Sequence, residues 1–282
     1  MSRSLPLQIA LDSSVLLQQE DVIDRLLAFC DWDRPALAED ILAAVNLMVP
    51  VGCRHPLIRI GGDGDGSYLV PDDLDGVVAC FSPGVADQIG FEQDLAKRWN
   101  IPSYLCDASV DPACLALDPS RQFFTQRWIG SFDGGQTQSL DAWVLGSKHA
   151  EAGDLLLQMD IEGAEYNSLL AASDSVLQCF RVIVIELHWL DLLGSARFLN
   201  QRALPMLRKL NLAFDCVHAH ANNCCGTVNL GPVTVPRVLE LTYYRRDRNT
   251  LPLRPWAPNP LDVVNVPSNP PLPLGAPWCQ PG

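Results

Sequence analysis

The chain has 282 residues, and 48% of them are hydrophobic, which is enough for a sizeable core in one catalytic-size domain. Its 33 acidic and 20 basic residues give a net charge of −13, which opposes binding to nucleic acids and to anionic membrane surfaces. No run of about 18 apolar residues occurs, and residues 1–20 lack the features of a signal peptide. We therefore expect a cytoplasmic protein that acts on a small molecule or a carbohydrate, with neither nucleic acid nor membrane as a partner.

Residues 21–49 carry apolar side chains at three- and four-residue spacing, which predicts two helices. From residue 251 onward proline is frequent, which predicts a segment that is extended on the surface and partly disordered. We expect an N-terminal helical extension (1–55), a central domain (56–250) and a proline-rich tail (251–282).

The central region alternates strand-like and helix-like segments. Strand patterns cover 77–84, 102–109, 122–131, 155–160 and 181–188, and helix patterns cover 87–99, 140–148, a stretch from 164, and 196–210. Such alternation predicts a doubly wound, Rossmann-like α/β sheet. Two further strand-like stretches, 213–223 and 236–246, leave no room between them for a full crossover helix, so we expect an antiparallel pair at a sheet edge.

The stretch LLLQMDIEGAEYNSLL contains an apolar run that ends in Asp160, Glu162 and Glu165. Parallel sheets bind ligands just outside the carboxyl ends of their strands, so these acids are candidates for a site. The alternative is that they cap and charge the first turn of the next helix. Both interpretations can hold for different residues.

A glycine turn follows the first strand of the alternating series at Gly84, and Asp107 comes 23 residues later, at the end of the second strand. An acid at about this distance from such a turn is typical of a group that binds ribose hydroxyls. The turn lacks G-x-G-x-x-G, and the nearby acids Asp87 and Glu92 would repel a pyrophosphate. The pattern favours S-adenosylmethionine and counts against a nicotinamide-dependent oxidoreductase.

Residues 59–74, RIGGDGDGSYLVPDDL, form a glycine- and aspartate-rich segment. A calcium-binding loop is excluded, because Tyr68 stands where the turn glycine should be and Leu74 where the last glutamate should be. We expect a loop that folds over the cofactor and brings Tyr68 to it; an ordinary glycine turn or hairpin is the alternative.

The ten cysteines are scattered and several lie in apolar runs, so we expect reduced thiols. The segment HAHANNCC (218–225) has four soft ligands, but adjacent cysteines rarely bind one ion, which argues against zinc.

The block MDIEGAEY resembles the K-x-D-I-E-G-x-E signature of FkbM-type methyltransferases. Four further blocks in the same order, RIGGDGDGSYLVP, FSPGVADQIGFE, VIVIELHWL and CVHAHANN, are similar to a methyltransferase-like branch of that group. The resemblance spans roughly residues 59–246. It implies a class I methyltransferase that uses S-adenosylmethionine, with Gly84 in the cofactor turn, Asp107 on the ribose hydroxyls and Asp160 at the methyl-donor side.

The chain departs from the family pattern at three positions. Ala86 replaces the usual second glycine, Pro83 precedes Gly84, and Gln158 replaces the basic residue before D-I-E-G. We still assign the cofactor site to Tyr68, Gly84, Glu92, Asp107 and Asp160.

Methyl transfer to a hydroxyl requires an aligned acceptor oxygen and a group that takes its proton. His188 follows the fifth strand, and His218 and His220 alternate on the sixth, so all three are candidates at one rim of the sheet together with Asp160. The other interpretation of a single histidine is a core residue that satisfies a backbone carbonyl.

Glu186, Asn222 and Asn223 are the candidate substrate-binding residues. Asp160, Glu186 and His218 could together bind a divalent metal such as Mg²⁺ that holds the acceptor oxygen. The alternative is that the two acids only orient the histidines or the cofactor.

The favoured function is O-methylation of a hydroxyl on a sugar or a small polar natural product, and N-methylation of an amine stays open. The alternatives are an inactive methyltransferase-like protein that binds a glycan or a partner, and a nicotinamide-dependent oxidoreductase. The N-terminal helices and the tail are surfaces through which a homodimer could form.

Overall fold

The computed structural model describes residues 34–250 and 258–278. The first of the two expected N-terminal helices lies outside the described residues, and so do residues 251–257 and 279–282 of the tail. The second expected helix is α2, Ala38–Met48, which buries one apolar face against the domain.

A seven-stranded mixed sheet forms the centre of the protein, in the order β10-β13-β9-β8-β3-β4-β5. Its strands are β3 (Val77–Pro83), β4 (Ser103–Cys106), β5 (Gln122–Thr125), β8 (Asp154–Met159), β9 (Phe180–Leu187), β10 (Phe214–Ala221) and β13 (Leu239–Arg245). Strand β13 runs antiparallel to both β9 and β10. The predicted mixed α/β sheet with an antiparallel final pair is confirmed, although β13 lies inside the sheet, so that only β10 of this pair is an edge strand.

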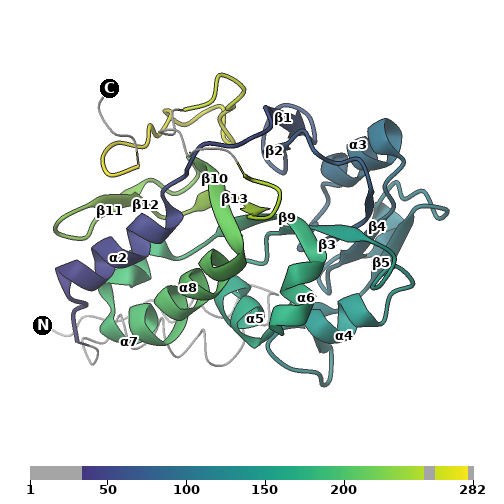
Figure 1. Ribbon diagram of the computed structural model, residues 1–282, viewed down its shortest axis with the longest axis horizontal. Helices are drawn as coiled ribbons and strands as arrows, with labels where there is room; N and C mark the ends of the chain where they lie inside the picture. The colour runs from purple at the N-terminus through teal and green to yellow at the C-terminus, as the bar shows by residue number, and fades with distance from the viewer. Residues whose placement is uncertain (1–33, 251–257, 279–282) are drawn as a thin grey trace, which may run out of the picture.

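Helices cover one face of the sheet and a helix with a hairpin covers the other (Figure 1). On the first face, α2 packs with α8 (Leu204–Ala213), and α5 (Glu165–Ala171) contacts α8 and α4 (Leu140–Leu145). The larger core lies between these helices and the sheet. The second core lies beneath α3 (Gly90–Trp99) and the hairpin of β1 (Leu57–Ile60) and β2 (Tyr68–Pro71). The remaining helical segments are α6 (Asp174–Cys179), α7 (Ala196–Phe198), η1 (Pro112–Cys114), η2 (Leu190–Gly194) and η3 (Leu199–Ala203).

Two small strand pairs differ from the expected pattern. The single strand expected at 122–131 divides into β5 and β6 (Trp128–Gly130), and β6 pairs with β7 (Thr137–Ser139) outside the main sheet. The stretch between β10 and β13 holds a short hairpin of β11 (Thr227–Asn229) and β12 (Thr234–Pro236). The glycine-rich segment joins β1 to β2, so it is the turn of a hairpin.

The strand order changes direction between β3 and β8. These strands are parallel neighbours, and the chain continues from β3 outward to β4 on one side and from β8 outward to β9 on the other. Their connections leave in opposite directions, which opens the crevice where α/β sheets bind ligands. The carboxyl ends of β3 and β8 therefore define where a site is expected.

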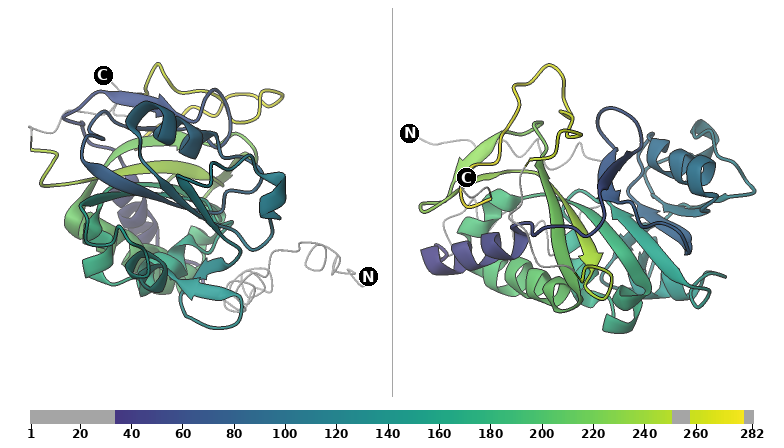
Figure 2. Two further views of the ribbon diagram at one scale, coloured as in Figure 1. Left: turned by 90° about the vertical axis from the view of Figure 1, so that its right-hand side faces the viewer. Right: turned by 45° about the horizontal axis from the view of Figure 1, so that its top comes forward.

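Residues 258–278 pack against the carboxyl end of β10 and the adjoining amino end of β13, and they are drawn in yellow in the views of Figure 2. Asn223 donates hydrogen bonds to the carbonyls of Val266 and Asn269, and Trp278 is 2% exposed. The part of the tail that the structure describes contains several turns, and it is anchored to the domain and partly buried.

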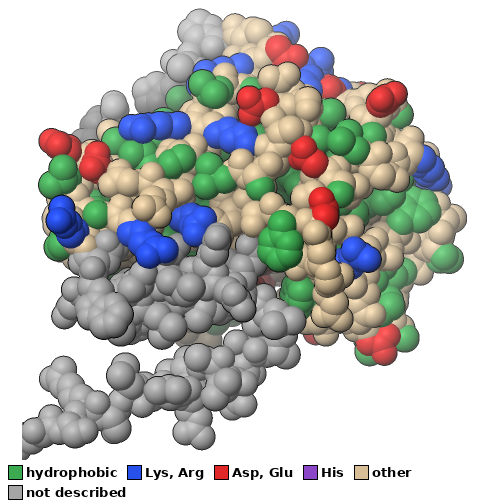
Figure 3. Space-filling view, turned by 90° about the horizontal axis from the view of Figure 1, so that it is seen from below, with side chains coloured by type: hydrophobic (Ala, Val, Ile, Leu, Met, Phe, Trp, Pro, Cys, Tyr) green, Lys and Arg blue, Asp and Glu red, His purple; other side chains and the backbone are tan. Residues whose placement is uncertain are grey.

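Charged side chains are unevenly spread over the helical face seen from below. Lys and Arg are more frequent on its left half and Asp and Glu on its right half (Figure 3). Among the described residues, no helix is long and apolar enough to cross a membrane.

Candidate active site

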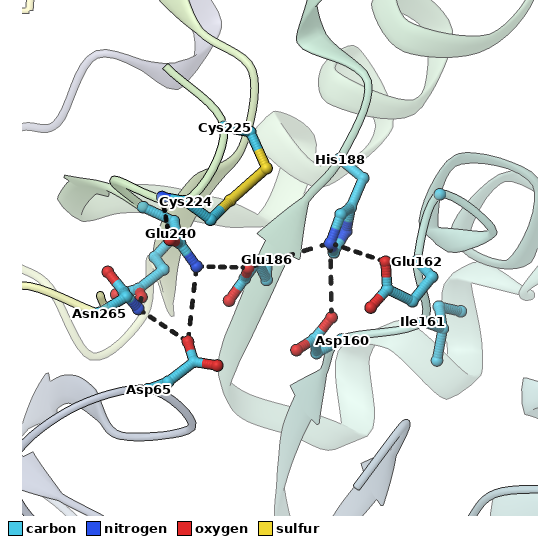
Figure 4. A network of polar contacts seen from close by, with 12 residues as sticks. Asp65, Asp160, Ile161, Glu162, Glu186, His188, Cys224, Cys225, Glu240 and Asn265 are labelled. Carbon is cyan, nitrogen blue, oxygen red and sulfur yellow. Dashed lines mark hydrogen bonds and ion pairs between the residues drawn. A yellow bond between two sulfur atoms is a disulfide. The ribbon is translucent and has the colours of Figure 1, made fainter. Parts of the chain in front are cut away.

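The residues that follow β8 and β9 form the centre of the candidate site (Figure 4). Asp160 comes directly after β8, Glu186 lies near the end of β9, and His188 follows it. The chain then turns sharply after Asp160: Glu162 and Gly163 both have a positive φ, of 56° and 107°. A Cβ on Gly163 would lie 2.3 Å from the Trp189 ring, so this position requires glycine. A non-glycine residue in this conformation, such as Glu162, is typical of functional turns.

His188 lies among four carboxylates. Its Nδ1 is 3.2 Å from Glu165 Oε1. Its Nε2 is 3.4 Å from Glu162 Oε2, 3.8 Å from Asp160 Oδ1 and 3.9 Å from Glu186 Oε1. One side of the ring is therefore held by Glu165, and the other nitrogen faces the other three acids.

Glu165 organises the turn as well as the histidine. It is fully buried, and its Oε1 accepts hydrogen bonds from the backbone N–H groups of Ile161 and Gly163. An acid in the first turn of a helix satisfies free N–H groups and favours the helix dipole. Glu165 thus lies in the first turn of α5, as the alternative interpretation expected, but its hydrogen bonds go to the turn before the helix, while Asp160 and Glu162 face the histidine.

The charged groups of this cluster shift one another's pKa values. Burial, followed by the charge of Glu186, raises the pKa of Asp160 well above its usual range, and burial raises the pKa of Glu186 to about 7. Burial would lower the pKa of His188, but the charge and hydrogen bond of Glu165 and the charges of the other acids raise it to about 10. The cluster therefore stabilises a positive charge at its centre.

A second acidic group adjoins the first. Glu240 on β13 lies directly opposite Glu186 on β9. Asn222 donates to Glu186 Oε1 at 2.9 Å, and Asn265 donates to Glu240 Oε1 at 2.6 Å. Both asparagines also contact Asp65 of the glycine-rich turn, so three distant segments meet at this point (Figure 4).

Asn265→Ala is expected to lower the free energy of unfolding by about 1–3 kcal/mol, because it leaves the buried Glu240 carboxyl without its amide donor. Urea denaturation measures the loss. Asn269→Ala is the control, since Asn269 donates to the Asn223 carbonyl without touching a carboxylate. An equal or smaller loss for Asn265→Ala would contradict the assignment.

Gly84 and Asp107 meet in the turn after β3. Gly84 has φ of 82°, and a Cβ there would lie 1.5 Å from the Asp160 carbonyl oxygen, so this glycine allows the two strand ends to touch. Asp107 accepts hydrogen bonds from the backbone N–H of Ala86 at 3.1 Å and of Ser109 at 2.8 Å. Asp107 therefore shapes the turn as well as closing the end of β4.

The other two predicted cofactor residues are buried beneath the strand ends. Tyr68 Oη is 3.4 Å from Glu186 Oε2, and its ring packs edge-on against Phe91. Glu92 accepts a hydrogen bond from Ser82 on β3, and burial raises its pKa to about 7. The structure brings Tyr68 to the acidic group and places Glu92 next to β3.

His218 and His220 differ from the expected arrangement. His218 Nε2 is 2.8 Å from Asp262 Oδ1, and His220 Nδ1 is 3.9 Å from Asp262 Oδ2. Both lie on β10, and β13 separates β10 from β9, the strand that His188 follows. The predicted metal ligands Asp160, Glu186 and His218 therefore do not form one group, because His218 pairs with Asp262 of the tail. Asn223, a predicted substrate-binding residue, also hydrogen-bonds to the tail.

Among the described residues, the group that could hold a metal is instead Asp160, Glu165 and His188. Sequence reasoning missed Glu240, Asp65 and Asn265 as neighbours of the site. The acid within the strand sequence LELTYYR was a signal for Glu240, and the aspartate-rich turn was a signal for Asp65. Nothing in the sequence pattern indicated Asn265.

The expectation of reduced cysteines is wrong at one pair, because Cys224 and Cys225 form a disulfide in the loop after β10. The backbone N–H of Cys224 donates to Asn222 Oδ1, so this loop supports the amide that binds Glu186. Six other described cysteines are free thiols.

No family model matches the chain, and no curated protein sequence matches it. One similar solved structure is the antibiotic-resistance methyltransferase Kmr, with 14% sequence identity and a TM-score of 0.28. The match covers 67% of this chain and 100% of that chain. A likeness this low carries no argument about function.

Proposed function

We propose that this protein is a methyltransferase that uses S-adenosylmethionine. The observation that carries the proposal is the meeting of Gly84 and Asp160 at the point where the strand order changes direction, with Asp107 at the next strand end. The antiparallel final strand pair beside parallel strands also agrees with the class I methyltransferase sheet that the resemblance implies. The resemblance of the MDIEGAEY block points the same way.

The donor groups around the crevice suit a cationic nucleoside. Asp160 and Glu162 follow β8, and Asp107 follows β4, so carboxylates line the strand ends where a phosphate group would be repelled. S-adenosylmethionine supplies an electrophilic methyl group on a positively charged sulfur. Asp160 Oδ1 is shielded from solvent and has no hydrogen-bond partner among the described residues. This oxygen is therefore available to interact with the positively charged sulfur of the cofactor.

We further propose a hydroxyl acceptor on a sugar or small polar compound, bound beside Glu186 and Asn222. His188 presents Nε2 to this side while Glu165 holds Nδ1. Such a nitrogen serves either as a proton acceptor or as a ligand of a cation that activates the acceptor oxygen. Its pKa of about 10 means that a neutral ring at ordinary pH requires a second cation nearby.

An inactive protein that binds a glycan or partner through the histidines of β10 is the second candidate. The pairing of His218 and His220 with Asp262 of the tail gives it less support, because the tail covers those side chains. Homodimer formation stays a prediction.

Asp107→Ala is expected to weaken binding of S-adenosylhomocysteine by about 10- to 100-fold, the effect of losing one or two hydrogen bonds to a charged group. Equilibrium binding of the labelled nucleoside measures it. Asp111→Ala is the matched control, because Asp111 only caps the exposed segment η1. Equal affinities of the Asp107→Ala and wild-type proteins would contradict the cofactor assignment.

A further inference from the structure

The disulfide between Cys224 and Cys225 joins two adjacent residues, so it closes the shortest loop that a disulfide can close. The stabilisation that a disulfide gives to a folded protein grows with the length of the loop that it closes. This bond therefore adds little to the stability of the domain as a whole. Its effect is confined to the loop that follows β10.

Both cysteines of this pair are exposed, whereas Cys80, Cys106 and Cys216 are buried free thiols. A disulfide is reduced when a thiolate attacks one of its sulfur atoms, so reduction requires access to that sulfur. Exposed disulfides are accordingly the ones that thiols open readily. A reductant in solution can therefore reach the bond between Cys224 and Cys225 while the core stays folded.

The backbone of the disulfide loop orients the side chain of Asn222. The N–H of Cys224 donates to Asn222 Oδ1 at 2.9 Å, and Asn222 Nδ2 donates to Glu186 Oε1, also at 2.9 Å. Asn222 is buried, and these two bonds use both ends of its amide. Figure 4 draws the disulfide together with the carboxyl groups of this network. A change in the backbone at Cys224 therefore reaches the Glu186 carboxylate through one side chain.

The chain is fixed on both sides of the disulfide to the residues just before β13. The N–H of Asn222 donates to the Val238 carbonyl at 3.2 Å, and the N–H of Arg237 donates to the Gly226 carbonyl at 3.0 Å. Residues 223–225 lie between these two anchors. Opening the disulfide frees the peptide between the two cysteines while the anchors hold, so the change stays local and can be reversed.

We propose that Cys224 and Cys225 form a redox switch that controls the position of the Asn222 amide. The reductant is a thiol of the glutathione class. Its thiolate attacks one of the two sulfur atoms, the bond between the cysteines breaks, and a mixed disulfide forms. A second thiol then displaces the cysteine from the mixed disulfide. The products are two cysteine thiols and one oxidised reductant, so two electrons and two protons have passed to the protein.

Reduction removes the constraint on the backbone of Cys224, whose N–H then leaves Asn222 Oδ1. The Asn222 amide no longer holds Glu186, and the acceptor binds more weakly. The effect on the acceptor rests on the proposed function. The opening of the loop does not rest on it, because it involves only the protein and a thiol.

The test is hydrogen–deuterium exchange of the full-length protein with and without dithiothreitol, with iodoacetamide to label the free thiols. We expect Cys224 and Cys225 to be labelled together, and only after reduction. The amide of Cys224 should then exchange about three- to tenfold faster, the effect of losing one hydrogen bond. A protein with both Cys224→Ser and Cys225→Ser should exchange like the reduced wild type under either condition.

Cys114→Ser is the matched control, because Cys114 is an exposed free thiol outside the loop. This variant should keep the full response to dithiothreitol. Labelling of Cys224 and Cys225 before reduction, or equal exchange of the Cys224 amide before and after it, would overturn the proposal. A normal response in a protein that does not bind S-adenosylhomocysteine would support the switch and reject only the proposed function.

Discussion

A His188→Ala protein is expected to transfer methyl groups about 10²- to 10⁴-fold more slowly than wild type, the usual contribution of a positioned proton acceptor. The reason is that Nε2 faces the acceptor side while Glu165 fixes the ring orientation. Whether the nitrogen takes the proton itself or holds a cation, its removal leaves the acceptor oxygen without activation. The rate is measured as transfer of a labelled methyl group to an acceptor found by screening hydroxylated compounds.

His149→Ala is the control for this loss. His149 contacts Tyr104 Oη at 2.9 Å and precedes β8, at the other end of that strand from Asp160. It should retain the wild-type rate. The His188→Ala protein should keep its affinity for S-adenosylhomocysteine within a few-fold, because the side chain is assigned to the acceptor. A His188→Ala rate within threefold of wild type would remove His188 from the mechanism.

Gly84→Ala is expected to lower the free energy of unfolding by more than about 3 kcal/mol, in the range that marks a severe backbone conflict. Its φ of 82° alone costs an alanine about 1 kcal/mol. The larger cost comes from the Asp160 carbonyl oxygen, 1.5 Å from the added Cβ, because this is backbone that moves only if β3 and β8 separate. Urea denaturation of the folded variant measures the change.

Gly135→Ala separates the two contributions. Gly135 also has a positive φ, of 55°, but no atom lies within 4 Å of an added Cβ. Its loss should stay near 1 kcal/mol. Similar losses for the two variants would show that the strand ends at Gly84 are not in close contact.

The alternation of apolar strands and helices predicted the centre of the fold because each buried strand, such as β8 (Asp154–Met159), is recognisable from local sequence alone. Asp160, Glu186 and His188 were found for the same reason, since they directly follow or end such strands. The position of β13 inside the sheet was missed, because strand order depends on contacts between distant segments.

The roles of His218 and Asn223 could not be predicted in the same way. Both lie on or after a strand that carries other site residues, and their partners Asp262 and Val266 are 44 and 43 residues further along the chain. A proline-rich sequence has no periodicity that reveals which face it covers. The same limit hid Asn265, which is 25 residues from Glu240 in sequence and 2.6 Å from it in space.

The most direct test of the account is calorimetric titration of the full-length protein with S-adenosylhomocysteine and, separately, with NAD. We expect one molecule of S-adenosylhomocysteine to bind per chain, with micromolar or tighter affinity, which corresponds to about −8 kcal/mol, and we expect no binding of NAD. Binding of NAD in place of S-adenosylhomocysteine, or binding of neither, would contradict it.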